Sequence, residues 1–238
     1  MPSRRRDNVD NGAVDKKQRR GSKAARTRAK ILAAALAQFR EHGYDGATMR
    51  DIAKAADMSL GAAYYHFASK DALVLAYYRD SVSRRREMVQ ARFAETDDLG
   101  ERLRALFHLH HEAVRGDRRL LGALVRSVAD PESEVSVFSA ATREVRNASI
   151  AICDEALAVD VVPEHVRDLG ALGLWGLDLA FMLYFVWDDS PDQARTAKLV
   201  DDTVEMILPL IPLLSSPLAG PLLSHVARTL LDAGLVPD

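Results

Sequence analysis

The chain has 238 residues, of which 48% are hydrophobic, so it is long enough to bury a substantial core as one or two domains. A single cysteine, Cys153, excludes an internal disulfide and fits a reducing cytosol. The charged N-terminus lacks the apolar run of a signal peptide, so we expect a cytoplasmic protein. The 32 Lys and Arg residues against 34 Asp and Glu give a net charge of −2, which by itself suggests no nucleic-acid partner.

The two signs of charge are unevenly distributed along the chain. Residues 1–86 carry 19 basic and 9 acidic side chains, a balance of +10, whereas residues 87–238 carry 13 and 25, a balance of −12. This asymmetry is typical of a basic DNA-binding part joined to an acidic part that cannot lie on DNA. We therefore expect any DNA contact to come from the first third of the chain.

Residues 1–22 are polar, and nothing in them can form a core. We expect a disordered basic tail there. Two roles stay open for it: a flexible arm that contacts phosphates or the minor groove, or a solubilising leader without a specific role.

Three helix start signals lie within residues 48–73, TMRDIAKAADMSLGAAYYHFASKDAL. Thr48 is a good N-cap with Asp51 three residues later, and Ser59 and Ser69 can cap the next two helices. Small alanines let the helices approach closely, and three larger side chains supply the core: Ile52, Met58 and Phe67. Short helices joined by one sharp turn predict a helix-turn-helix DNA-binding unit.

Further matching positions lie on both sides of the turn. They are Ile31, Leu32, Ala35, Leu36 and Phe39, a Gly43-Tyr44 break, and Thr48, Arg50, Tyr64, His66, Phe67, Ser69 and Lys70. Over roughly residues 25–85 the sequence thus resembles the N-terminal domain of the TetR (tetracycline-repressor-like) family of bacterial transcription regulators. One position departs, because Asp57 stands in the turn where this family usually has Gly. Asp tolerates the left-handed conformation, so we expect the turn to form, although a negative charge beside a phosphate backbone is unfavourable.

The helix from Ser59 to about His66 is expected to enter the major groove. Its first residues face base edges, where Leu60 and Ala62 can pack on thymine methyl groups and Gly61 allows close backbone approach. The resemblance implies that other residues of this region touch phosphate or sugar. The predicted DNA-binding residues are Thr48, Arg50, Ser59, Leu60, Gly61, Ala62, Tyr64, Tyr65, His66 and Lys70.

Two of these residues have a structural alternative. Tyr65 and His66 could simply seal the small core of the helix-turn-helix unit. Ala63 and Phe67, on the same helix, are assigned to that core and not to DNA contact.

Everything beyond Asp97 reads as helix, and the helix that begins at Ser69 is long enough to reach Phe93. Further helices are predicted at 99–115, 118–129, 132–158, 163–187, 190–214 and 219–233, with breaks near Gly116, Pro131, Pro163, Pro191 and Pro217. We therefore expect an all-α fold. Its parts are a tail at 1–22, an N-terminal three-helix helix-turn-helix domain at 23–85, and a larger helical ligand-binding and dimerisation domain at 86–238.

The segment from Leu169 to Trp187 is apolar nearly all round, with Asp178 as its only charge. Its 19 residues could span a membrane, but a charge near the middle would cost roughly 2.5–3.5 kcal/mol on insertion. In a soluble protein, a subunit interface on one side and a core or cavity on the other would bury such a helix. A stripe of small residues also allows close helix contact: Gly170, Gly173, Gly176 and Ala180.

The histidines His108, His110 and His111 lie on one predicted helix near Glu112, so a metal site is conceivable. No second ligand group stands out elsewhere, and we assign no metal and no cofactor. A ligand pocket between this helix and the apolar one is an alternative, and plain core packing is another. The predicted ligand-binding residues are Leu103, Phe107, His111, Trp175, Asp178, Leu179 and Met182.

The sequence shows no Gly-rich phosphate loop, no nucleophile elbow and no paired metal ligands with a glutamate base, so we expect no enzyme. The resemblance implies a homodimeric, ligand-responsive transcription regulator, most simply a repressor, that binds a palindromic double-stranded DNA operator without a membrane partner. By similarity the dimer interface would come from 163–187 and 190–214, with the helix from Ser69 as coupling element. The alternative is an architectural DNA-binding dimer with no small-molecule effector.

Overall fold

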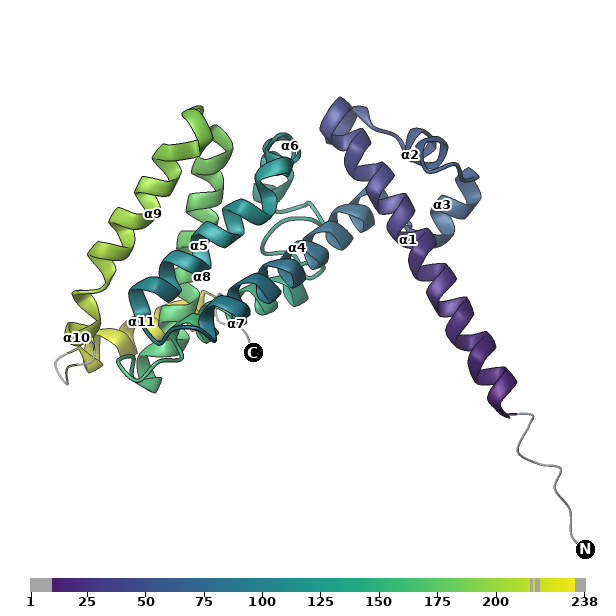
Figure 1. The fold of residues 1–238 in the computed structure, drawn as a ribbon. Coiled ribbons are helices and arrows are strands. Elements are labelled where there is room, and N and C mark those ends of the chain that lie inside the picture. The colour runs from purple at the N-terminus through teal and green to yellow at the C-terminus, as the bar shows by residue number, and fades with distance from the viewer. Residues whose placement is uncertain (1–9, 215, 217–218, 234–238) are drawn as a thin grey trace, which may run out of the picture. The chain divides into compact units, whose positions relative to one another are not determined.

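The computed structural model describes the backbone of residues 10–214, 216 and 219–233 (Figure 1). The regular elements in these ranges are all helices, as the sequence predicts. The chain divides into two compact units, Met1–Ala76 and Tyr77–Asp238.

The first unit contains the helices that precede the boundary: α1 (Asp10–Gly46), α2 (Met49–Ala55), α3 (Leu60–His66) and the start of α4 (Lys70–Phe93). Gly43 interrupts α1 with a φ of 75°, at the predicted Gly43-Tyr44 break. Thr48, Ser59 and Ser69 cap α2, α3 and α4 through their hydroxyl oxygens, as predicted. The core includes side chains that are no more than 2% exposed, among them Ile31, Ala35, Phe39, Ile52, Ala63 and Phe67.

The start of α1 differs from the sequence prediction. The backbone is helical from Asp10, whereas the sequence predicts a disordered tail over 1–22, and residues 1–9 lie outside the described residues. Ala, Lys, Gln and Arg fill most of 13–20. These residues favour helices, and a helix that is already nucleated extends at little cost. The prediction of a disordered tail rests on the lack of core-forming residues, which does not exclude an exposed helix.

The second unit contains the rest of α4 and a bundle of further helices (Figure 1). They are α5 (Leu99–Val114), η1 (Arg115–Asp117), α6 (Arg118–Ala129), α7 (Arg143–Leu157), α8 (Glu164–Trp187), η2 (Pro191–Gln193), α9 (Ala194–Ile207), α10 (Leu210–Leu214) and α11 (Gly220–Asp232). Residues from α4, α5, α7, α8 and α9 meet in one hydrophobic core, whose fully buried members include Val89, Leu103, Leu106, Phe107, Ile152, Cys153 and Val200.

Two predicted helices are shorter than expected. The helix predicted at 132–158 begins only at Arg143, because hydroxyl groups in the preceding segment bond to nearby carbonyls and compete with helix formation. Thr142 Oγ1 donates to Ser136 O at 2.7 Å, and Ser139 Oγ donates to Glu134 O at 2.6 Å. The helix predicted at 190–214 is split into η2, α9 and α10, with a break after Ile207 that proline at position 209 favours.

Helix α8 is long and apolar enough to cross a membrane by length and composition alone, but the core helix of a soluble protein meets the same criteria. Only 33% of its most apolar window is buried within the chain. Its single central charge, Asp178, is 2% exposed and bonded to two other helices. These contacts fit the prediction of a core helix that leaves one apolar face for another partner.

Candidate DNA-binding surface and buried polar cluster

A tight turn centred on Asp57 joins α2 to α3. Its φ of 53° lies in the left-handed region, and the N–H groups of Asp57 and Met58 donate to Lys54 O at 3.0 Å and Ala53 O at 2.9 Å. The predicted turn therefore forms with Asp in place of Gly. The Asp57 carboxylate is exposed and lies 3.9 Å from Nζ of Lys30, so part of its charge is offset within the unit.

The N-terminus of α3 offers few side-chain hydrogen-bonding groups. Ser59 Oγ accepts from the N–H of Ala62 at 3.1 Å, so the only hydroxyl at this end is engaged as a helix cap. Gly61 is exposed, and a Cβ built there would meet nothing within 4 Å. Leu60 and Ala62 are half-buried. This end of α3 therefore presents backbone and methyl surface, which suits close approach to base edges.

The middle of α3 presents two exposed aromatic rings. Tyr64 is 49% exposed and Tyr65 is 86% exposed, so Tyr65 does not seal the core and its structural alternative is removed. His66 is half-buried and lies edge-on to the Tyr65 ring, with centroids 5.2 Å apart. Ala63 and Phe67 are 0% and 2% exposed, which confirms their assignment to the core.

Two basic side chains, Arg28 and Lys70, form hydrogen bonds that hold the helices of this unit together. Arg28 of α1 donates to the His66 carbonyl at 2.8 Å and lies 4.0 Å over the Phe67 ring, so it positions the end of α3. Sequence reasoning missed Arg28 because one cation on a polar helix face carries no distinct signal. Lys70 donates to the Tyr44 carbonyl at 2.7 Å, so this predicted phosphate contact already has a partner within the unit.

The remaining predicted DNA contacts come from α2. Thr48 Oγ1 accepts from the Asp51 N–H at 3.2 Å and is exposed, as is Arg50. Arg50 also lines a surface depression of about 480 Å³ at the turn, together with Lys54, Ser59 and Leu60. Residues of α2 and α3 thus share one exposed face with cationic groups at its border.

Comparison with known sequences identifies this unit. A sequence model described as "Bacterial regulatory proteins, tetR family" matches residues 31–77, which include all of α2 and α3. Residues 31–77 are a TetR-family DNA-binding domain.

Two curated relatives illustrate the extent of this likeness. Over 69 residues this chain is 42% identical to the HTH-type transcriptional repressor AcnR of Corynebacterium glutamicum, covering 29% of this chain and 37% of that protein. Over 104 residues it is 35% identical to the HTH-type transcriptional regulator UidR of Escherichia coli, covering 42% and 50%. The chain therefore spans at most half the length of these two relatives.

Solved structures extend the likeness to most of the fold. The fatty acid degradation regulator FadR from Bacillus halodurans aligns with a TM-score of 0.61 at 21% identity, covering 75% of this chain and 94% of that one. FadR from Bacillus subtilis, solved in complex with stearoyl-CoA, aligns with a TM-score of 0.60 at 18% identity, covering 74% and 96%. At these identities the comparison establishes the all-α fold alone.

In the second unit, four side chains form a buried polar cluster: Arg85 of α4, His110 and His111 of α5, and Asp178 of α8. Asp178 Oδ2 accepts from Arg85 Nη1 at 2.8 Å, and both Asp178 oxygens lie 3.0 Å from His110 Nδ1. Arg85 Nη2 also donates to the carbonyl of Leu106 at 3.2 Å. Arg85 and Asp178 are 1% and 2% exposed, so the cluster joins three helices inside the core.

The cluster has no net charge at pH 7. Burial would raise the pKa of Asp178, but Arg85 and His110 outweigh that effect and hold the pKa at about 2. Burial lowers the pKa of His110 and lowers the pKa of His111 to about 4. The carboxylate and the guanidinium therefore balance each other, and both histidines are neutral hydrogen-bonding groups.

Among the residues that the structure describes, two polar atoms of the buried polar cluster find no hydrogen-bond partner. They are Nε of Arg85 and Nε2 of His111. A buried polar group left unpaired costs about 1–3 kcal/mol, and native proteins pair nearly all such groups. The cluster is thus neutral in charge but incomplete in hydrogen bonding.

The predicted ligand-binding residues gather where α5 meets α8, but they pack as core. Leu103 and Phe107 are 0% exposed, His111 is 6%, Asp178 is 2%, Trp175 is 8%, and Leu179 and Met182 are half-buried. Phe107 meets Phe181 edge-on with centroids 4.9 Å apart, while Trp175 meets Phe138. A groove of about 600 Å³ between α7, α8 and α11 contains none of the seven.

Sequence reasoning missed Arg85 and His110, the two side chains that bond to Asp178. Arg85 is the middle residue of Arg84-Arg85-Arg86, and three consecutive arginines are typical of a solvent-exposed basic surface. The available signal was helical spacing, because Arg85 falls on the same face of α4 as Val82 and Val89.

The conceivable metal site at the histidines is not assembled. His108 Nε2 lies 2.8 Å from Asp201 Oδ1, while His110 turns to Asp178 and the His111 ring stacks on Phe185 at 5.0 Å. Within the described ranges, no group of three or more His, Cys, Asp or Glu side chains could hold a metal ion.

Proposed function

We propose that this chain is a cytoplasmic transcription repressor that binds a palindromic DNA operator as a homodimer and is released by a small-molecule effector. The observation that carries the proposal is the capped α3, which presents an exposed N-terminus and two exposed tyrosines in a TetR-type helix-turn-helix unit. Such a unit places its second helix in the major groove.

The proposed DNA contacts follow from exposure and chemistry. The α3 residues Ser59 to Ala62 face base edges. Their methyl groups contact thymine methyl groups, and their backbone fits closely into a groove of matching shape. Tyr64, Tyr65 and Arg50 border this end and contact phosphates, together with Thr48, His66 and Lys70. Because few side-chain hydrogen bonds are available, much of the sequence preference rests on DNA shape.

Dimerisation is supported by two exposed apolar stripes, one on α8 and one on α9 and α10, that the described part of the chain does not cover. On α8 the exposed residues follow a 3-4-3-4 spacing: Gly173, Gly176, Ala180, Leu183 and Trp187. On α9 and α10 the exposed apolar residues are Leu199, Met206, Leu210 and Leu213. A heptad-like spacing is that of helices packing in a bundle, so a second copy of the chain can cover both stripes.

A two-fold dimer predicts the form of the operator. Two α3 helices related by a two-fold axis enter successive major grooves, so the half-sites repeat about 34–36 Å apart or at a multiple of that distance. The operator is then palindromic.

The proposed effector carries an apolar chain. FadR from Bacillus subtilis was solved with stearoyl-CoA and FadR from Thermus thermophilus with lauroyl-CoA, and this chain shares the fold of both. Acyl-CoA thioesters are therefore the first compounds to test, with Leu103, Phe107, His111, Trp175, Asp178, Leu179 and Met182 as the proposed lining. An effector can shift the chain off DNA only by its difference in affinity between the two states.

A second candidate function is an architectural DNA-binding dimer without an effector. The close packing of the proposed lining, with Leu103 and Phe107 fully buried, favours it. The two functions differ in one measurement, operator affinity by fluorescence anisotropy with and without lauroyl-CoA. If the chain is a repressor that an effector releases from DNA, lauroyl-CoA should weaken operator binding at least tenfold. If it is an architectural protein, lauroyl-CoA should leave the affinity unchanged.

The DNA-binding part of the proposal has its own test. Tyr64→Ala should weaken operator binding at least tenfold, since it removes a phosphate contact and an exposed ring beside the groove. Phe138→Ala, which removes a 59% exposed ring from the second unit, is the matched control and should leave affinity unchanged. Equal affinities for both variants would mean that α3 is not the reading helix.

A further inference from the structure

The hydrogen bonding of the buried polar cluster is uneven. Both oxygens of Asp178 have partners, because Oδ2 accepts from Arg85 Nη1 and both oxygens lie 3.0 Å from His110 Nδ1. The open groups are Arg85 Nε and His111 Nε2, and both belong to side chains less than a tenth exposed. Two buried polar atoms without partners in one cluster are the kind of group that a bound molecule satisfies.

The chemistry of the open groups restricts what can bind them. The guanidinium of Arg85 is always charged, and its Nε–H can only donate. Neutral His111 can hold its proton on Nε2 and donate as well. A hydrogen-bond acceptor matches both groups, whereas an ammonium head would place a second positive charge and further donors against them.

The surroundings of the cluster are aromatic. The His111 ring stacks on Phe185 at 5.0 Å, and Phe107 meets Phe181 at 4.9 Å. An acceptor that reaches Arg85 and His111 therefore belongs to a molecule with an apolar body. Carbonyl and carboxyl groups on an alkyl chain have this combination.

We propose that Arg85 and His111 are the polar anchor of the effector site and hold the carbonyl or carboxyl oxygen of an apolar, acyl-type ligand. Asp178 and His110 act as positioning residues, because they fix the guanidinium and leave Nε for the ligand. This inference rests on the proposed ligand response and adds the two groups that hold the polar end of the ligand.

The class of ligand is tested with three probes of equal chain length. Decanoic acid, 2-decanone and decylamine are titrated into the full chain by calorimetry, and operator binding is measured on the same samples. We expect decanoic acid or 2-decanone to bind at least tenfold more tightly than decylamine. Tighter binding of decylamine, or binding of none of the three below 1 mM, overturns the proposal.

The anchor itself is tested with matched variants on the same helices. Arg85→Lys removes Nε, and its control Arg86→Lys alters the neighbouring, half-exposed arginine, which pairs with Glu155. His111→Phe keeps the ring stacked on Phe185 but removes Nε2, and its control is His108→Gln. The two anchor variants should weaken binding of the acceptor probe at least tenfold, and the controls less than twofold.

The outcomes separate this inference from the function on which it rests. Retained operator binding with unchanged probe affinity in Arg85→Lys and His111→Phe would show that the cluster is structural only. His111→Phe leaves the Arg85–Asp178 pair intact, so it tests the anchor even if Arg85→Lys does not fold. Loss of operator preference in the unmodified chain would contradict the proposed function instead.

Discussion

The carboxylate of Asp188 accepts two hydrogen bonds from Thr196, one from its backbone N–H at 2.8 Å and one from its hydroxyl at 2.7 Å. The other oxygen of Asp188 accepts from the N–H and hydroxyl of Ser190. Asp188 follows the last residue of α8, and Thr196 lies in the first turn of α9. The pair therefore fixes the corner between the two helices that carry the exposed apolar stripes.

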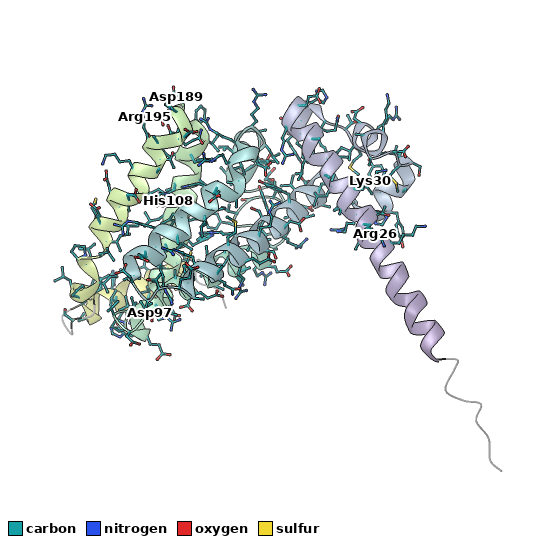
Figure 2. The ribbon with its side chains drawn as sticks, viewed as in Figure 1. Arg26, Lys30, Asp97, His108, Asp189 and Arg195 are labelled. Atoms are coloured by element: carbon teal, nitrogen blue, oxygen red, sulfur yellow. The ribbon has the colours of Figure 1, made fainter. Side chains whose placement is uncertain are left out.

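The corner gives a stability prediction. Asp188→Asn removes the charge that strengthens four hydrogen bonds, and we expect the free energy of unfolding to fall by about 1.5–3 kcal/mol. Asp189→Asn is the matched control, because Asp189 is exposed and forms a surface ion pair with Arg195 (Figure 2). Urea unfolding at pH 7 measures both, and equal midpoints for the two variants would contradict this role of Asp188.

The pKa of His111 predicts a pH dependence of stability. Its folded pKa of about 4 lies below the ordinary value of 6.5, so the unfolded chain binds a proton more readily. The contribution to stability is complete above pH 6.5 and is lost as the pH falls towards 4. We expect His111→Phe to lose less stability than the unmodified chain between pH 7 and pH 4.5, measured by urea unfolding. The same loss in both proteins would argue against a buried neutral His111.

The exposed stripe on α8 gives a prediction on assembly. Leu183→Glu places a charge within the proposed dimer interface and should convert the dimer to monomer, because a buried unpaired charge is costly. Leu222→Glu on α11 is the control, since Leu222 is also exposed but lies outside both stripes. Light scattering after size exclusion gives the mass, and a dimer that survives Leu183→Glu would exclude this face as the interface.

The charge in the helix-turn-helix turn predicts a variant with stronger DNA binding. Asp57→Asn keeps a residue that tolerates a φ of 53° and removes the carboxylate, so operator affinity should rise roughly twofold to fivefold at low salt. The gain should shrink as salt screens the charge. Glu41→Gln, an exposed acid elsewhere in the same unit, is the control in anisotropy titrations. Equal gains in both variants would indicate a general charge effect.

The first unit was largely predictable because its signals are local. The caps at Thr48, Ser59 and Ser69 and the tolerated Asp57 each depend on residues within a few positions along the chain. The same reasoning failed at residues 132–142, where hydroxyl-to-carbonyl bonds replaced an expected helix. In this segment the residues are compatible both with a helix and with turns held by side-chain hydroxyl groups, and the spacing of the apolar residues does not distinguish the two.

The buried polar cluster was less predictable because its contacts join distant positions. Arg85 and Asp178 are 93 residues apart along the chain, and nothing local marks Arg85 as buried among three consecutive arginines. The pairing of α5 with α8 was anticipated from their apolar faces, but which histidine meets Asp178 depends on the rotation of α5. The sequence pattern shows which side of α5 faces α8, but it does not decide which of two adjacent residues, His110 or His111, meets Asp178.

The most direct test of the account is selection of bound DNA by the full chain from a random double-stranded pool. A two-fold symmetric motif should be enriched, with half-sites about 34–36 Å apart or a multiple of that distance, and Tyr64→Ala should lose the enrichment. Recovery of no preferred sequence at moderate salt, or of an asymmetric motif that Tyr64→Ala binds equally well, would contradict a dimeric regulator that reads DNA through α3.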